Sequence, residues 1–321
     1  MKIEMDDTLN LLYCFDNNYN LQMMASVNSF LNFYDKPVKI HILHNDPKNI
    51  KKVISPLYGY KNVDEIKIYK FIKNKNFLFP AIENHHVTEA TYYRLFLHNY
   101  IPDTTNKLLY IDPDVIAMNN LTKVLDDSFN LLSSSKFTIG GVSYSSSIND
   151  NNLEMFNRLG MKSTKYFNAG VLLIDYRKWG QFGIGEKILS HTKEMDNLEM
   201  LLQHDQDVLN SFFDGKFFEL GYRFNYPLLE RFYSQDKEKI ENSYFVHYVG
   251  REKPWLLNGV FGDISKYYQK NFKEVFSRIH FVNDGNFGYK SIFKFYVKNT
   301  FFRIKKVFIL YQVLKETSNK V

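Results

Sequence analysis

Short apolar runs alternate with segments of helical spacing through about residue 250 of the chain. Apolar runs of this length, bounded by polar residues, predict strands that are buried on both faces of a sheet. The predicted strands are Leu11–Phe15, Val38–Leu43, Ile66–Tyr69, Leu108–Ile111, Phe137–Val142, Val171–Asp175 and Phe245–Val249. Residues 21–34 are compatible with a helix, and Thr88 is a typical N-cap for a second one over 89–101. This alternation predicts an α/β fold with a mainly parallel sheet and helices on both faces.

Two carboxylates, Asp112 and Asp114, follow the strand at Leu108–Ile111 directly. In extended backbone, residues two apart point the same way, about 6–7 Å apart. Pro113 between them favours extended geometry and removes a backbone donor, so it ends the strand pairing. Like charges that face one point are costly unless a positive charge lies between them, which predicts a divalent cation.

The Asp-x-Asp spacing is weak evidence by itself. A chain of this length contains about one such pair by chance, and this chain has a second pair in Asp205 and Asp207. The position at the end of a strand adds weight, because ligands of α/β sheets bind beyond the carboxyl ends of the strands.

Composition narrows the class of protein. With 321 residues, 45% hydrophobic and 17% aromatic, the chain is long and apolar enough to bury a large core. The single cysteine, Cys14, excludes an internal disulfide and a cysteine zinc cluster. The first residues lack the layout of a signal peptide, and no apolar run approaches the ~20 residues of a membrane span. We therefore expect a cytoplasmic protein.

The net charge of +6 is concentrated near the C-terminus. Residues 287–321 contain eight basic residues and one acidic residue, a net +7, so the remaining chain carries about −1. A nearly neutral body argues against a nucleic-acid groove.

Several stretches carry residues suited to binding and catalysis. They are FDNNYN with Asp16 and Asn18, TYYRL with Arg94, DPDV, YFNAG with Asn168 and Ala169, HDQDVLN with Asp205 and Gln206, and VHYVGREKPW with His247, Gly250 and Lys253. Taken singly, each has an ordinary explanation, such as an Asx turn for Asp16, a surface ion pair for Arg94 or a core histidine for His247. Together, in this order and spacing, they resemble glycosyltransferase family 8 over roughly residues 9–256.

The resemblance implies a fold of the GT-A type, with residues 1–280 as the catalytic domain, and transfer of glucose or galactose from UDP with retained configuration. The acceptor would be a saccharide, glycolipid or glycoprotein of surface glycan synthesis. By the same resemblance, Mn²⁺ is the cofactor, with Mg²⁺ as a substitute, and its ligands are Asp112, Asp114 and His247. An imidazole beside two carboxylates agrees, because it favours Mn²⁺ or a later metal over Ca²⁺.

The resemblance also implies roles for the other residues. Cys14, Asp16 and Asn18 would hold the uracil and ribose edge of the nucleotide, and Lys253 would add a positive contact to the diphosphate. Pro113 and Gly250 would also contact the nucleotide-sugar. The donor sugar would be surrounded by Arg94, Asn168, Ala169, Asp205 and Gln206. Asp205 and Gln206 are the expected catalytic residues, with Asp205 accepting hydrogen bonds from sugar hydroxyls.

Gln206 would lie on the face of the sugar opposite the leaving group. A carboxamide is a poor nucleophile, so front-face attack by the acceptor hydroxyl is favoured over a covalent intermediate. One departure concerns the acceptor: Tyr144 stands where family members often have an aspartate.

The residues are also compatible with two other classes of protein. A metal hydrolase would use the same carboxylates and histidine with an activated water, and a non-catalytic glycan- or membrane-binding protein would need neither Gln206 nor the HxxGxxKPW pattern.

The tail at 281–321 has its own alternatives. If helical, it carries an apolar stripe of Phe293, Val297, Phe301, Ile304, Phe308 and Tyr311. The basic residues beside the stripe favour attachment to an anionic membrane surface over burial against the body or a second copy of the chain.

Overall fold

Six of the seven predicted strands lie in one seven-stranded sheet, which has the order β3-β2-β1-β4-β7-β6-β8. The seventh, predicted at Phe245–Val249, belongs to a second, smaller sheet, and the edge strand β8 was not predicted. The computed structural model describes residues 6–73, 88–143, 150–195, 201–283, 288–300 and 307–318. The strands are β1 (Asp6–Phe15), β2 (Val38–His44), β3 (Val63–Lys70), β4 (Thr105–Ile111), β6 (Ile139–Ser143), β7 (Phe167–Asp175) and β8 (Phe218–Glu219). The first four are parallel, and β7 runs antiparallel between β4 and β6. The mainly parallel sheet is therefore confirmed.

Alternate residues of each central strand point into two separate cores. In β1, Leu12 and Cys14 face one core, and Leu11, Tyr13 and Phe15 face the other. Both sets are buried, as expected for a strand covered on both faces. The central strands therefore read as continuous apolar runs.

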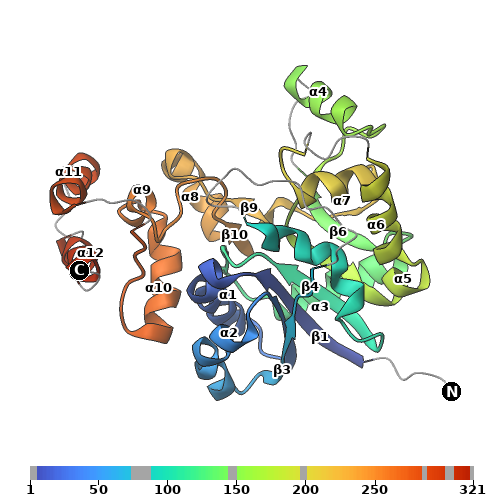
Figure 1. Ribbon diagram of the computed structural model, residues 1–321, viewed down its shortest axis with the longest axis horizontal. Helices are drawn as coiled ribbons and strands as arrows, with labels where there is room; N and C mark the ends of the chain where they lie inside the picture. Colours follow the sequence, from blue (N-terminus) through green and yellow to red (C-terminus); the bar gives the residue numbers. More distant parts are fainter. Residues whose placement is uncertain are drawn as a thin grey trace.

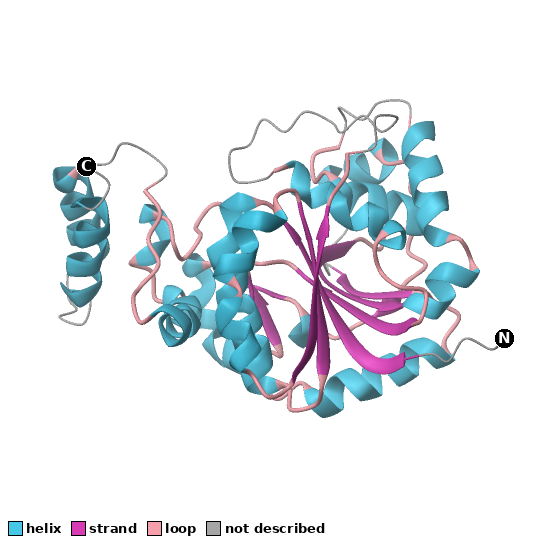
Figure 2. Cartoon of the chain, turned by 60° about the horizontal axis from the view of Figure 1, so that its bottom comes forward, coloured by secondary structure: helices cyan, strands magenta, loops and turns pink. Residues whose placement is uncertain are grey.

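Helices cover both faces of the sheet (Figure 2). The α-helices of the body are α1 (Asn20–Phe33), α2 (Pro47–Val53), α3 (Thr122–Ser134), α4 (Asp150–Arg158), α5 (Tyr176–Gln181), α6 (Ile184–Glu194), α7 (Asp205–Phe213), α8 (Tyr233–Glu241), α9 (Leu257–Val260) and α10 (Ser265–Phe276). Helices α1, α2 and α3 pack on the core that contains Phe15, and α5, α6 and α7 pack on the other. The helix expected at 21–34 is confirmed as α1.

The helix expected after Thr88 is a 3₁₀ helix, η3 (Glu89–Asn99). Thr88 caps it, because its hydroxyl accepts a hydrogen bond from the Ala90 amide. A 3₁₀ helix has three residues per turn, so residues three apart eclipse one another. Thr88, Thr91 and Arg94 therefore share one side of η3, and all three line the same cleft. Shorter 3₁₀ helices are η1 (Asn17–Tyr19), η2 (Ser55–Gly59), η5 (Tyr222–Phe224) and η6 (Glu230–Phe232).

A second sheet of three strands, β5-β10-β9, joins the first at the Asp-Pro-Asp segment. Its strands are β5 (Val115–Ala117), β9 (Tyr226–Pro227) and β10 (Phe245–His247). The Asp112 amide donates to Gly170 O of the large sheet at 2.8 Å, whereas the Tyr248 amide donates to Asp114 O at 3.1 Å, next to the small sheet. The two carboxylates therefore lie where the chain passes from one sheet to the other.

The C-terminal region forms two helices beyond α9 and α10, at one end of the molecule (Figure 1). They are α11 (Tyr289–Thr300) and α12 (Val307–Ser318). Ile292, Leu310 and Val313 are buried in a small core with residues of α9 and the segment after α10. Of the predicted stripe, Phe293, Val297 and Tyr311 are exposed, whereas Phe301, Ile304 and the Phe308 side chain lie outside the described residues. One face of this pair is thus buried against the body and another is open.

Within the part of the chain that the structure describes, none of the helices has the length and hydrophobicity needed to cross a membrane.

Candidate active site

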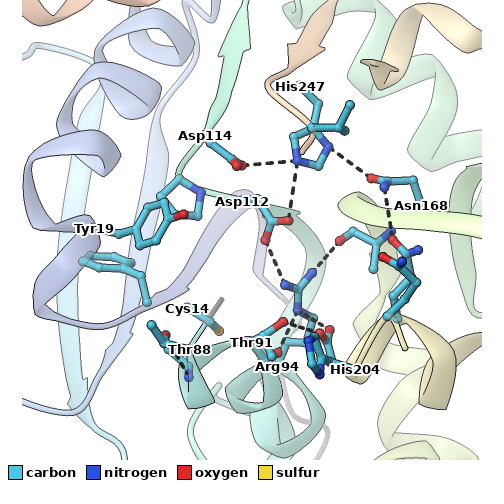
Figure 3. A pocket seen from close by; sticks show the side chains of 18 of the residues that line it. Cys14, Tyr19, Thr88, Thr91, Arg94, Asp112, Asp114, Asn168, His204 and His247 are labelled. Atoms are coloured by element: carbon cyan, nitrogen blue, oxygen red, sulfur yellow. Dashed lines mark hydrogen bonds and ion pairs between the residues drawn. The ribbon is translucent and has the colours of Figure 1, made fainter. Parts of the chain in front are cut away.

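A polar cleft of about 430 Å³ opens at the carboxyl ends of β1 and β4. Because β7 is antiparallel to β4, the start of β7 lies at the same edge and adds Asn168 and Ala169. The segment before α7 and the segment after β10 complete the lining (Figure 3). Of the residues expected from the sequence, the cleft brings together Cys14, Arg94, Asp112, Pro113, Asp114, Asn168, Ala169, Asp205, Gln206, His247, Gly250 and Lys253.

Asp112, Asp114 and His247 converge at one point of this cleft. One donor atom from each lies within 4.8 Å of the other two. His247 Nε2 is 3.2 Å from Asp114 Oδ1 and 4.0 Å from Asp112 Oδ2. Two carboxylate oxygens and an imidazole nitrogen in this arrangement offer three ligands to a divalent cation.

The hydrogen bonds around His247 leave the correct ring nitrogen available for a metal. The Gly170 amide donates to Asn168 Oδ1 at 2.9 Å, and since a backbone amide can only donate, that atom is an acceptor. The same oxygen lies 3.1 Å from His247 Nδ1, so Nδ1 carries the hydrogen. Nε2 then keeps its lone pair and faces the two carboxylates, as metal-binding histidines do. The residues present therefore fit a divalent cation.

Lys253 lies beside the proposed metal ligands. Its ammonium is 2.6 Å from Asp114 Oδ2 and is also bonded to Tyr248 O. Burial acts to raise the pKa of Asp114, but the positive charge of Lys253 outweighs it and holds the pKa well below its usual range. Asp114 is therefore ionised at neutral pH, as a metal ligand must be.

Arg94 links the Asp112 side of the cleft to the Asp205 side. Its Nη2 is 2.9 Å from Asp112 Oδ1, its Nε is 2.8 Å from Asp205 Oδ2, and its Nη1 donates to Ala169 O at 2.6 Å. The guanidinium also stacks over the ring of Tyr110 at 4.2 Å. With 7% of its surface exposed, Arg94 is a buried, fully engaged cation rather than a surface ion-pair partner.

Asp205 is 2% exposed at the start of α7. Burial raises its pKa to about 6, although Arg94 and the Thr91 hydroxyl act in the opposite direction. Both of its carboxylate oxygens have a partner, one in Thr91 and the other in Arg94.

Gln206 is the next residue of α7 and also lines the cleft. Its carboxamide oxygen accepts from the Ala169 amide at 2.9 Å and from Asn168 Nδ2 at 3.1 Å. The residue expected at the reacting centre is thus anchored to the first residues of β7.

Two expected residues stand apart from the lining. Asp16 caps η1 by accepting from the Asn18 amide at 3.0 Å, and Asn18 is exposed. This is the Asx turn that the residue pattern alone predicts. Cys14, two residues earlier, is in the cleft, and burial raises the pKa of its thiol. Gly250 has a φ of 77°, a left-handed conformation that favours glycine.

Sequence reasoning missed several residues of the site. Tyr19, Thr88, Thr91, His204 and Arg251 also line the cleft. The threonines carried a usable signal, namely their spacing of three before Arg94. A sixth residue, Asn225, donates to Asn168 Oδ1 at 2.7 Å, and no local pattern marks it because it meets the site only through tertiary packing.

The arrangement offers specific chemistry. A cation held by the Asp-Asp-His group, together with Lys253, suits a diphosphate. Beside it, carboxylate and amide groups from Asp205, Asn168 and Gln206 suit a ligand with several hydroxyl groups.

The comparison with known proteins agrees with this chemistry. The sequence profile of glycosyl transferase family 8 matches residues 10–259. General stress protein A of Bacillus subtilis is 28% identical over 271 residues, which is 79% of this chain and 89% of that protein. The lipopolysaccharide 1,3-galactosyltransferase of Salmonella typhimurium is 26% identical over 278 residues, which is 82% of this chain and 77% of that enzyme.

Among solved structures, the galactosyltransferase LgtC in complex with donor and acceptor sugar analogues has a TM-score of 0.64 at 22% identity. The match covers 86% of this chain and 98% of LgtC. At this sequence identity the structural similarity shows the fold alone, and the GT-A type of fold expected from the sequence is confirmed. With the family profile spanning most of its length, the chain belongs to glycosyl transferase family 8 and is a glycosyltransferase.

Proposed function

We propose that the protein transfers glucose or galactose from a UDP-sugar to a glycan acceptor, with retention of configuration and with a divalent metal. The observation that carries this proposal is the convergence of Asp112, Asp114 and His247 beside a polar pocket in a family 8 chain. Several relatives are named as lipopolysaccharide galactosyl- or glucosyltransferases, which supports a hexose donor and a surface-glycan acceptor.

Mn²⁺ is the proposed metal, with Mg²⁺ as a substitute, because the ligands combine two carboxylates with one imidazole. When bound, such a cation offsets the negative charge of a diphosphate leaving group. Lys253 adds a positive charge on the same side. Gly250, three residues earlier, has a left-handed conformation and also lines the cleft.

For the nucleotide, we propose Cys14, Asp16 and Asn18 at the end of β1, with Pro113 beside the metal. Cys14 lines the cleft, whereas Asp16 and Asn18 form the turn that follows it. Their contribution would be to shape the rim against the uridine.

For the sugar, we propose Arg94, Asn168, Ala169, Asp205 and Gln206. Arg94 donates hydrogen bonds to Thr91 O, Ala169 O and Asp112 through its three nitrogens. It also forms an ion pair with Asp205, so its main role would be to hold the two carboxylates in place. Asp205 would accept hydrogen bonds from sugar hydroxyls.

Front-face attack is the proposed route. The acceptor hydroxyl enters on the side from which the phosphate departs, and the phosphate oxygen takes its proton. Gln206, across the ring, stabilises the positive charge that develops at the sugar through the dipole of its carboxamide. The acceptor itself is not specified by the described residues, and Tyr144, which departs from the family pattern, lies outside them.

A donor panel tests the proposal. The purified protein is given UDP-glucose, UDP-galactose and their N-acetyl forms with Mn²⁺ or with EDTA, and UDP release is measured with and without an added oligosaccharide. We expect Mn²⁺-dependent release from a hexose donor that rises with acceptor. Release that never responds to any acceptor would favour a hydrolase.

For location, we propose that the protein acts in the cytoplasm and that α11 and α12 attach it to an anionic membrane surface. Phe293, Val297 and Tyr311 are exposed by 55%, 38% and 62%, and Lys290 and Lys294 are exposed beside the first two. An apolar face flanked by lysines suits the headgroup region of anionic lipid, where each basic residue contributes about 1 kcal/mol.

The membrane proposal is tested without disturbing the buried face of the tail. A triple variant, Phe293→Ser, Val297→Ser and Tyr311→Ser, is compared with Tyr58→Ser, which removes an equally exposed aromatic ring from η2. Sedimentation with phosphatidylglycerol vesicles should be lost only in the triple variant. Equal sedimentation of all proteins would contradict membrane attachment by this face, and self-association in ultracentrifugation would assign the face to a homo-oligomer instead.

A further inference from the structure

The carboxamide of Gln206 has one fixed orientation. The atom that faces the Ala169 amide at 2.9 Å must be an oxygen, since a backbone amide can only donate. Asn168 Nδ2 donates to the same oxygen at 3.1 Å. Both lone pairs of Oε1 are therefore in use, and Nε2 lies on the opposite side of the group.

On that opposite side, Nε2 donates to the hydroxyl of Tyr166 at 3.2 Å. Because this hydroxyl accepts from Gln206, its own hydrogen must go to another acceptor. Asp207 Oδ1 is at 2.6 Å and takes it. The chain of donors thus runs in one direction, from Gln206 through Tyr166 to Asp207.

Asp207 ends the chain as an acceptor only. Its second oxygen accepts from the Gln203 amide at 2.9 Å and faces the guanidinium of Arg158 at 3.5 Å. The side chain has no exposed surface and does not line the cleft. Successive helix residues point about 100° apart, so Gln206 faces the cleft while its neighbour in α7 faces the interior.

We propose that Tyr166 and Asp207 are positioning residues that hold the Gln206 carboxamide in its orientation toward the sugar site. This inference rests on the proposed function, because it assigns the second carboxylate of the Asp-Gln-Asp sequence a role in the same reaction. Without the hydroxyl, the Nε2 end of the carboxamide loses its partner while Oε1 keeps its two donors. The group is then held less firmly about its last torsion, where the energy profile is broad. The dipole that faces the sugar is then less firmly fixed. A preorganised dipole contributes most in a site that excludes water.

The test is a double-mutant cycle. Tyr166→Phe removes only the hydroxyl, and we expect kcat for UDP release to fall about 10- to 100-fold, the range found when outer hydrogen-bond partners of a metal ligand are removed. The KM for donor and the affinity for UDP should change less than about threefold, because the affected contact is with the reacting sugar. In the Gln206→Ala background, the same substitution should cause no further loss, since the group it positions is gone.

Tyr176→Phe is the matched control. Tyr176 is also a buried tyrosine, and its hydroxyl donates to Ile101 O at 3.1 Å, remote from the cleft. This variant should lose some stability and keep its kcat. Asp207→Asn is a second variant that keeps the shape of the side chain, and it should lower kcat in the same way. It keeps the proposal testable if Tyr166→Phe does not fold.

Three results would overturn the proposal. The first is an unchanged kcat in both Tyr166→Phe and Asp207→Asn. The second is a fall in kcat on Tyr166→Phe that is equally large in the wild-type and Gln206→Ala backgrounds. The third is a loss of UDP affinity as large as the loss in kcat. Failure of the proposed function is distinguishable, because the wild-type protein would then release no UDP from any donor.

Discussion

Gly170→Ala is expected to disable the metal site without unfolding the sheet. Gly170 lies in β7, and a Cβ built there would be 2.3 Å from His247 Cε1 and 2.5 Å from Nδ1. Ordinary carbon contacts are about 3.5–4.0 Å, so the imidazole must retreat by roughly 1 Å or more. The absence of a side chain at Gly170 therefore allows the imidazole of His247 to reach the two carboxylates.

The size of the effect follows from the tolerance of metal–ligand bonds. Functional coordination distances vary by about 0.2 Å, far less than the forced shift of the imidazole. We expect Mn²⁺ affinity to fall at least as much as it does on loss of an outer-shell partner, about 10- to 100-fold. Overpacking of a core position costs about 1–3 kcal/mol of stability, which a domain of this size tolerates.

The assay is calorimetric titration of Mn²⁺ in the presence of UDP, with thermal unfolding measured in parallel. Gly140→Ala is the matched control, because Gly140 also lies in a buried strand but an added Cβ would meet its nearest neighbours at 3.6 Å, an ordinary contact. Wild-type Mn²⁺ affinity in Gly170→Ala would refute the reasoning. Equal losses of affinity in both variants would refute it as well.

Three further predictions concern the same site. Asp114→Asn should abolish UDP release while circular dichroism stays native, because one charged ligand of the metal is lost. Asn225→Ala should lower Mn²⁺ affinity about 10-fold in calorimetry, since it removes a partner that holds Asn168 against His247. Turnover should fall as the pH drops below about 6, because burial raises the pKa of Asp205 to about 6 and only the ionised form above it attracts Arg94 fully. A kcat profile that stays flat from pH 7 to pH 5 would contradict this assignment.

The sheet was predictable because its strands are buried on both faces and therefore form apolar runs, as at Leu108–Ile111. Asp112 and Asp114 were predictable as a pair because they follow the end of a strand, where sequence position and spatial position correspond. His247 was grouped with them by the family resemblance, and the structure brings the three together. Arg94 was predictable as a site residue from the family resemblance. Its actual partners were not, since Asp205 is more than a hundred residues away and approaches only in the fold.

Other features depended on packing that no local pattern encodes. The 3₁₀ geometry of η3 places Thr91 beside Arg94, whereas helical spacing in the sequence suits an α-helix equally well. Tyr166 and Asp207 read as core residues until their hydrogen bonds to Gln206 are traced. In the tail, amphipathic spacing identified an exposed apolar face, but the burial of Val313 depends on the surface formed by α9.

The most direct test of the central claim is the binding of UDP measured by calorimetry in Mn²⁺ and again after EDTA, for the wild-type protein and for Asp114→Asn. If Asp112, Asp114 and His247 hold a cation that binds the diphosphate, the wild-type protein binds UDP tightly in Mn²⁺ and at least tenfold more weakly in EDTA. Asp114→Asn then binds weakly in both conditions. Equal UDP affinity with and without the metal, or no UDP binding in any condition, would contradict the account.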